Sequence, residues 1–291
     1  MATRTSLVTF CLRATLFSLP LLTFLIGWTG GVSRSLEILF SGSAPETAVW
    51  ANNWDDLRKH TARSIVILLT CATCFIIYGA HQKKTFLETT RDIGFTVFSK
   101  HSITMLFFAF SGWYFSHFGA GLIARTLSTY IPRYDIATEA VPPENTVSFF
   151  LATIQAGPTE ELALVPLFLL LIPAAFSQRY KRWGMGVAIT LAIAARVSFH
   201  LYYGPTAFVQ HSIWAAGVII TWLITRNVLG LILAHSCSNG LISLAISPAY
   251  SWLVYLHLCI FFICLIVLLG TLAKALERRR ETKKLAESSS S

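Results

Sequence analysis

The residues best suited to chemistry are two adjacent glutamates, Glu160 and Glu161, which follow Gly157-Pro158-Thr159 in an apolar segment. Proline suits the first turn of a helix, and the amide dipoles at that end favour carboxylates. Successive helical residues point about 100° apart, so one acid can face the centre of a bundle while a neighbouring helix holds the other. A carboxylate in a dry site suits a general base. Alone, the pair could equally be helix-start acids at the water boundary.

A second group consists of Arg196 and His200, which are four residues apart and share one face of a predicted helix. Arginine does not lose its proton at membrane depth, so it needs a carboxylate partner or a water-filled cavity. The acids available inside apolar segments are Glu160 and Glu161. We therefore infer an ion pair between Arg196 and one of them. His200 by itself could also be a structural histidine.

A third group, His235 and Asn239, has the same four-residue spacing. Both side chains can donate hydrogen bonds, and two donors that converge on one point can stabilise a developing oxyanion. The alternative is that they join helices through polar contacts. The three groups carry more weight together than singly, because no other apolar segment concentrates as many polar side chains. We interpret the lone histidines His117, His211 and His257 as packing or interfacial residues.

Long apolar segments position these groups. Of the 291 residues, 54% are hydrophobic and 13% are charged, and the mean hydropathy is +0.61, whereas a soluble domain carries about 25% charged residues. A membrane span needs about 20 mostly apolar residues. By that measure we expect spans near 9–28, 64–80, 103–124, 146–177, 184–203, 208–225, 228–246 and 252–274. The sequence predicts an all-α, polytopic transmembrane helical bundle of about eight spans, multi-pass in the cell membrane.

The fourth predicted span is too long for one straight helix. We expect Gly157-Pro158 to divide it, because proline cannot continue the hydrogen-bond ladder of a helix. Pro166 and Pro173 should add further kinks.

The net charge of +9 does not indicate a nucleic-acid partner, because the lysines and arginines lie in short clusters between apolar segments. Most of the 23 basic residues fall on the side that would hold both termini, and the positive-inside rule places that side in the cytoplasm. The cysteines lie within apolar segments, which does not fit a disulfide framework.

We divide the chain into three regions. Residues 1–144 hold three N-terminal transmembrane helices, and residues 145–250 hold the core with the three polar groups. Residues 251–291 hold the last span and a basic, Ser-rich cytoplasmic tail, which we expect to be frayed.

The three groups resemble the motifs of the CAAX-protease and bacteriocin-processing (CPBP) family, also called the Abi family, over about residues 145–245. In order and spacing, the matching residues are Glu160-Glu161, His200 and His235-x-x-x-Asn239. Members of this family are intramembrane endopeptidases. The resemblance implies a peptide or protein substrate in or at the membrane and the lipid bilayer as surroundings.

By this resemblance, Glu160 and His200 would position and activate a water molecule. His235 and Asn239 would hold the oxyanion, and Glu161 would orient the site. No cofactor is implied. A second mechanism would place a divalent metal at Glu160, His200 and His235, although the sequence lacks the His-Glu-x-x-His helix of many zinc peptidases.

One position departs from the family's first motif, Glu-Glu-x-x-x-Arg. This chain has Val165 in place of the arginine, and Pro166 follows it. Arg196 could supply the missing charge from a neighbouring helix. The departure favours one alternative function, a non-catalytic relative that acts as a membrane scaffold or immunity-type protein. Another alternative is a proton-coupled transporter that uses the same Glu/His set, but the two halves of the chain show no repeat symmetry.

Overall fold

The computed structural model of the protein describes residues 2–41, 54–95, 100–131, 146–245 and 250–288. All regular structure in these ranges is helical, which confirms the all-α prediction. The elements are α1 (Ala2–Ser41), α2 (Trp54–His81), α3 (Phe86–Ile93), α4 (Lys100–Leu127), α5 (Thr146–Ile154), α6 (Ala156–Leu164), α7 (Pro166–Ala175), the 3₁₀ turn η2 (Gln178–Tyr180), α8 (Lys181–Ser198), the 3₁₀ turn η3 (Leu201–Tyr203), α9 (Pro205–Thr225), α10 (Val228–Ala245) and α11 (Leu253–Ser288).

Six segments of the described chain are long and apolar enough to cross a membrane: Leu7–Ile38, Trp54–His81, Thr146–Ala175, Pro205–Thr225, Val228–Ala245 and Leu253–Thr271. The predicted spans 103–124 and 184–203 fall on helices α4 and α8, but neither helix meets the same requirement. In α8 the reason is the charge of Lys181, Arg182 and Arg196. The structure therefore supports six of the eight predicted spans. The cytoplasmic location of both termini stays a prediction.

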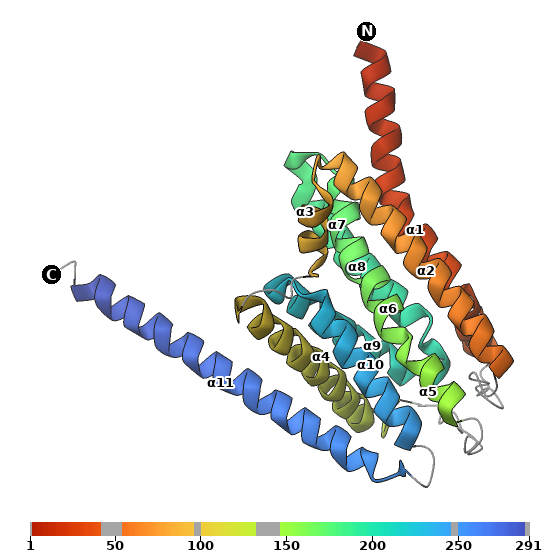
Figure 1. The fold of residues 1–291 in the computed structure, drawn as a ribbon, viewed down its shortest axis with the longest axis vertical. Helices are drawn as coiled ribbons and strands as arrows, with labels where there is room; N and C mark the ends of the chain where they lie inside the picture. Colours follow the sequence, from red (N-terminus) through yellow and green to blue (C-terminus); the bar gives the residue numbers. More distant parts are fainter. Residues whose placement is uncertain (1, 42–53, 96–99, 132–145, 246–249, 289–291) are drawn as a thin grey trace.

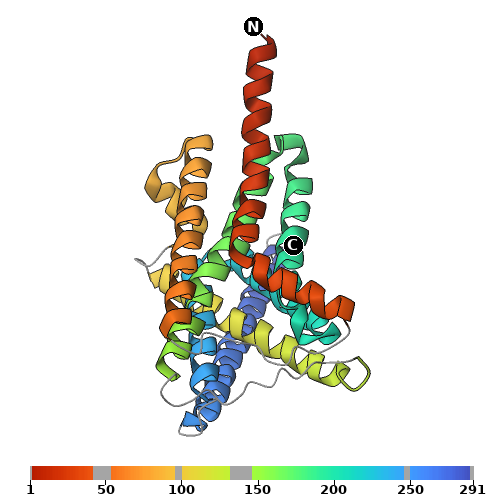
Figure 2. The ribbon, with the colours of Figure 1, turned by 90° about the vertical axis from the view of Figure 1, so that its right-hand side faces the viewer.

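The helices form one bundle around the segment Thr146–Ala175, which is the most deeply buried of the six. Figure 1 shows α6, α7 and α8 between α1 and α2 on one side and α4, α10 and α11 on the other. Helix α4 packs against α9, α10 and α11, and α1 packs against α7 and η3. Helix α1 is bent, and its first turns project beyond the bundle (Figure 2). Helix α11 continues to Ser288, beyond the predicted end of the last span at residue 274, and the fraying of this tail stays a prediction. The predicted boundary between residues 144 and 145 lies outside the described residues.

Two breaks divide the central segment into α5, α6 and α7. The first falls at Gln155, slightly before the predicted Gly157-Pro158, because the proline occupies the first turn of α6, where its missing N–H is not needed. The second falls at Val165 (φ −108°, ψ −82°), where the following Pro166 disfavours helical backbone. The predicted division of this span is confirmed, and the two glutamates lie on the short helix between the breaks.

Helix α6 approaches α10 closely at Gly157. A Cβ atom at this position would collide with Ser236 Oγ and would lie 2.6 Å from the carbonyl oxygen of Ile232. Ser236 Oγ donates a hydrogen bond to the carbonyl of Ile154 (2.8 Å), at the end of α5. The absence of a side chain at Gly157 therefore sets the distance between the helix that carries the glutamates and the helix that carries His235.

Replacing Gly157 with alanine should lower the free energy of unfolding by about 1–3 kcal/mol, because the new methyl group forces α6 and α10 apart. Thermal and denaturant unfolding of the detergent-solubilised protein would measure this loss. Gly186→Ala in α8 is the matched control, since nothing lies within 4 Å of the added Cβ. Equal stability of the two variants would show that the close approach does not matter.

Helix α3 joins the bundle where α9 turns into α10. Thr85 caps its N-terminus through its side-chain oxygen, and the helix ends at Gly94, whose φ of 103° favours glycine. Trp222 Nε1 donates to the carbonyl of Ile93 (3.1 Å), and the Val228 N–H donates to the carbonyl of Gly94 (3.2 Å). These bonds fix the ends of α9 and α10.

Candidate active site

Side chains from three helices meet at one carboxylate oxygen of Glu161, which lies on a fourth helix, α6. Oε1 of Glu161 accepts hydrogen bonds from Arg196 Nη2 on α8 (3.0 Å) and from His235 Nδ1 on α10 (2.8 Å). It also accepts one from Trp113 Nε1 on α4 (3.0 Å). Glu161 is 0% exposed and Arg196 is 1% exposed. The structure therefore contains the inferred ion pair, and Glu161 is the acid that forms it.

Trp214 of α9 covers this charge cluster. The guanidinium carbon of Arg196 lies 4.5 Å from the centre of the Trp214 ring, in a cation–π contact. The Trp214 ring meets both Trp113 and His235 nearly perpendicularly, at 5.4 Å between centres in each case. The two indoles therefore enclose the imidazole of His235 and exclude water from the ion pair, which strengthens its electrostatic attraction.

Glu160 has surroundings different from those of Glu161. Its side chain is 8% exposed, and its buried Oε2 has no hydrogen-bond partner in the part of the chain that the structure describes. It lies close enough to His235, Arg196 and Arg63 of α2 to interact with them electrostatically. Three donors hold Oε1 of Glu161, and its Oε2 has no partner among the described residues, whereas Glu160 accepts no hydrogen bond from them at either oxygen and can accept a proton.

His200 follows α8 and is half-buried. Its Nδ1 donates to the backbone carbonyl of Arg196 (2.8 Å), because a carbonyl oxygen can only accept. In the neutral imidazole this bond leaves the lone pair on Nε2. The His200 ring also stacks on His211 of α9, with 3.9 Å between centres and 13° between planes. The backbone bond and the stacked ring together fix the orientation of His200.

Asn239 is half-buried and bonded to α5. Its Nδ2 donates to the carbonyl of Thr153 (3.3 Å), one of the last carbonyls of α5, which have no partner within their own helix. This bond uses one of the two amide N–H groups. The structure places Asn239 one helical turn from His235, and its role in an oxyanion site stays a prediction.

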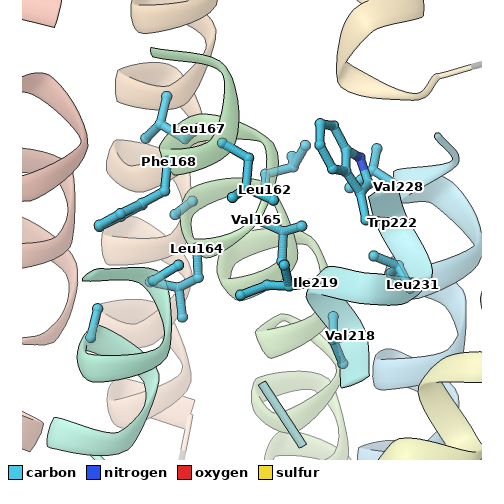
Figure 3. Close-up of a cluster of buried hydrophobic side chains, with 14 of the residues drawn as sticks. Leu162, Leu164, Val165, Leu167, Phe168, Val218, Ile219, Trp222, Val228 and Leu231 are labelled. Atoms are coloured by element: carbon cyan, nitrogen blue, oxygen red, sulfur yellow. The ribbon is translucent and has the colours of Figure 1, made fainter. Parts of the chain in front are cut away.

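Val165, the position at which the resembling family has arginine, is 1% exposed and lies in an apolar cluster (Figure 3). The cluster includes Leu162, Val218, Ile219, Trp222, Val228 and Leu231. The positive charge that pairs with Glu161 comes instead from Arg196, on a different helix.

Some residues around the site carried no signal in the sequence. Trp113 and Trp214 belong to no motif, and the sequence indicates packing or interfacial roles for His117 and His211. His117 stacks on Trp113, with 4.9 Å between centres and 17° between planes. The four-residue spacing of Trp113 and His117 places them on one face of α4. Such a pair in an apolar helix is nevertheless indistinguishable from ordinary packing.

Glu160, His200 and His235, the residues of the alternative metal site, do not form a metal-binding cluster in the described part of the chain. Among the described residues, no group of three or more His, Cys, Asp or Glu side chains is arranged to hold a metal ion. His235 Nδ1 is bonded to Glu161.

The six apolar helices define the class of the chain, which is a multi-pass membrane protein. Residues 142–241 match the family model described as Type II CAAX prenyl endopeptidase Rce1-like. The match confirms the resemblance to the CAAX-protease family and, at the level of the family, indicates a membrane protease. The matched segment contains all three motifs, whereas Trp113 and Arg63 lie outside it. Comparisons with curated proteins and with solved structures gave no match.

Proposed function

We propose that the protein is an intramembrane endopeptidase, which hydrolyses a peptide bond of a substrate in or at the membrane. The contrast between the two glutamates carries this proposal. Three donors hold Oε1 of Glu161, whereas Glu160, buried beside it, accepts no hydrogen bond from the described residues. Such a carboxylate can take a proton from a water molecule. The family match supports the same class of reaction.

Glu160 and His200 act on the attacking water in this proposal. Glu160 accepts one proton as the water oxygen forms a bond to the peptide carbonyl carbon, and the electron pair of the C=O bond moves to its oxygen. His200 accepts a hydrogen bond from the same water through Nε2, whose lone pair is set by the bond from Nδ1 to Arg196. When the carbonyl re-forms, the C–N bond breaks, and the proton on Glu160 passes to the leaving amine.

His235 and Asn239 would stabilise the oxyanion. Because Nδ1 of His235 donates to Glu161, Nε2 can donate only when the imidazole carries a second proton. The Glu161 carboxylate stabilises that imidazolium. The second N–H of the Asn239 amide, one turn further along α10, provides another donor. Loss of one such donor typically lowers kcat by about 10²–10³.

The ion pair of Arg196 argues against the alternative function of a non-catalytic relative. That alternative rested on Val165, which replaces the arginine of the first motif. The positive charge beside the second glutamate is present, although it comes from α8. This supports activity without the arginine of the first motif.

Replacing Glu160 with glutamine should make a peptide or protein accumulate in membranes, because the variant cannot take the proton from water. Mass spectrometry of membrane fractions would compare this variant with the wild type and with His200→Ala. Glu277→Gln changes an exposed carboxylate of α11 and is the control. The same substrate should accumulate in both site variants and not in the control. If no species differs between Glu160→Gln and the wild type, the proposed activity is wrong.

A further inference from the structure

Trp113 reaches the site from α4, outside the segment that matches the family model. Its side chain is 0% exposed, and its Nε1 donates to the same oxygen of Glu161 that accepts from Arg196 and His235. These contacts join residues 48, 35 and 74 positions apart in the chain. Hydrogen bonds to one carboxylate oxygen thus connect α4, α8 and α10 to α6.

Trp113 also contacts His235 directly. The two rings stack, with 5.0 Å between centres and 30° between planes, while Trp214 meets the imidazole nearly perpendicularly. A rotation of the His235 ring by 180° would place a carbon atom where Nδ1 now meets Glu161. The indole on one face, the second indole at the edge and the carboxylate at Nδ1 together leave one orientation for this ring.

The three donors to Glu161 differ in whether their charge can change during the reaction. The imidazole of His235 can exist with or without its second proton, and this changes the strength of its bond to the carboxylate. Indole only donates and does not ionise, so the bond from Trp113 is the same at every step. It can hold the carboxylate in place while the charge on His235 changes.

We propose that Trp113 is a positioning residue of this site, which holds Glu161 and the ring of His235 so that Nε2 of His235 stays directed at the developing oxyanion. The role rests on the proposed function, since it acts through His235 rather than on the substrate. It also extends the functional site to a helix that the matched segment does not include.

The contact itself can be tested without any turnover, by NMR of the protein labelled with ¹⁵N at the indole nitrogens. The signal of Trp113 is the one that Trp113→Phe removes. Glu161→Gln replaces an anionic acceptor with a neutral one and should shift this signal clearly. Glu160→Gln changes the neighbouring carboxylate and should leave it nearly unchanged. A Trp113 signal that does not respond to Glu161→Gln would overturn the proposal, whatever the activity.

The second measurement compares kcat and KM for the peptide that accumulates in Glu160→Gln. Trp113→Phe keeps an aromatic ring and removes the N–H group, so kcat should fall about tenfold or more while KM changes little. Trp222→Phe is the matched control, because Trp222 is also 0% exposed and also donates one buried hydrogen bond, to Ile93. This control should retain the wild-type kcat.

Two results would contradict the positioning role. One is a wild-type kcat for Trp113→Phe, and the other is an equal fall in kcat for Trp222→Phe, which would indicate a general packing effect. If the wild type itself turns over no peptide while the Trp113 signal still depends on Glu161, the proposed function fails together with the positioning role. The contact between the two residues would then stand as a structural one.

Discussion

Replacing Arg196 with leucine should lower the free energy of unfolding by about 3–5 kcal/mol, because it leaves a buried carboxylate without a charged partner. Glu161 would keep the bonds from Trp113 and His235, but indole is neutral and the imidazole is charged only when doubly protonated, whereas the guanidinium is always charged. The substitution also removes the cation that lies against Trp214. Denaturant unfolding in detergent micelles would measure the loss of stability.

Arg179→Leu is the control for this prediction, since Arg179 is exposed on the turn η2 and should contribute less than about 0.5 kcal/mol. A charge swap tests the pairing itself. The double variant Arg196→Glu with Glu161→Arg should recover part of the stability that each single variant loses. If the double variant is no more stable than either single one, the ion pair does not hold these helices together.

Replacing Val165 with arginine should also destabilise the protein, by more than about 3 kcal/mol, although it restores the residue of the family's first motif. The side chain at this position lies among apolar residues of α9 and α10 (Figure 3), where a guanidinium would be an unpaired buried charge. Glu161 already pairs with Arg196. The free energy of unfolding and the peptide processing of the variant would both be measured.

Val165→Met separates the effect of charge from that of size, because methionine adds a long flexible side chain without charge. Overpacking alone should cost about 1–3 kcal/mol, so the methionine variant should be more stable than the arginine variant. Wild-type stability and increased processing in Val165→Arg would mean that an arginine here reaches Glu161. In that case Arg196 is not the substitute for the family's arginine.

Both substitutions, at Arg196 and at Val165, test which helix supplies the positive charge beside the second glutamate. In the family's first motif, Glu-Glu-x-x-x-Arg, the arginine follows the second glutamate by four residues, which is about one helical turn. In this chain the helix breaks at Val165, before Pro166, and the charge comes from α8. A missing residue in a motif therefore does not imply a missing interaction, because another helix can supply the same group.

Several features were predictable from the sequence because their physical causes are local. A charge inside an apolar segment is costly, by roughly 2.5–3.5 kcal/mol on insertion scales, so Glu160, Glu161 and Arg196 stood out without any structure. The breaks of the central span lie close to Pro158 and Pro166, because proline lacks the N–H that would continue the hydrogen-bond ladder of the preceding helix. The number of spans differed from the prediction, since α4 and α8 form helices that do not meet the length, hydropathy and charge requirement of a membrane span.

What the sequence by itself determined is the class of the protein, its helices and the polar groups that its interior must accommodate, since these depend on side-chain chemistry and on spacing within one helix. Only the tertiary structure decided that Glu161 rather than Glu160 pairs with Arg196, that Asn239 bonds to α5, and that Trp113 donates to Glu161. The physical reason is that these contacts join residues far apart in the chain. They depend on how each helix is rotated about its axis and packed against its neighbours, and the spacing of residues within a helix does not specify either.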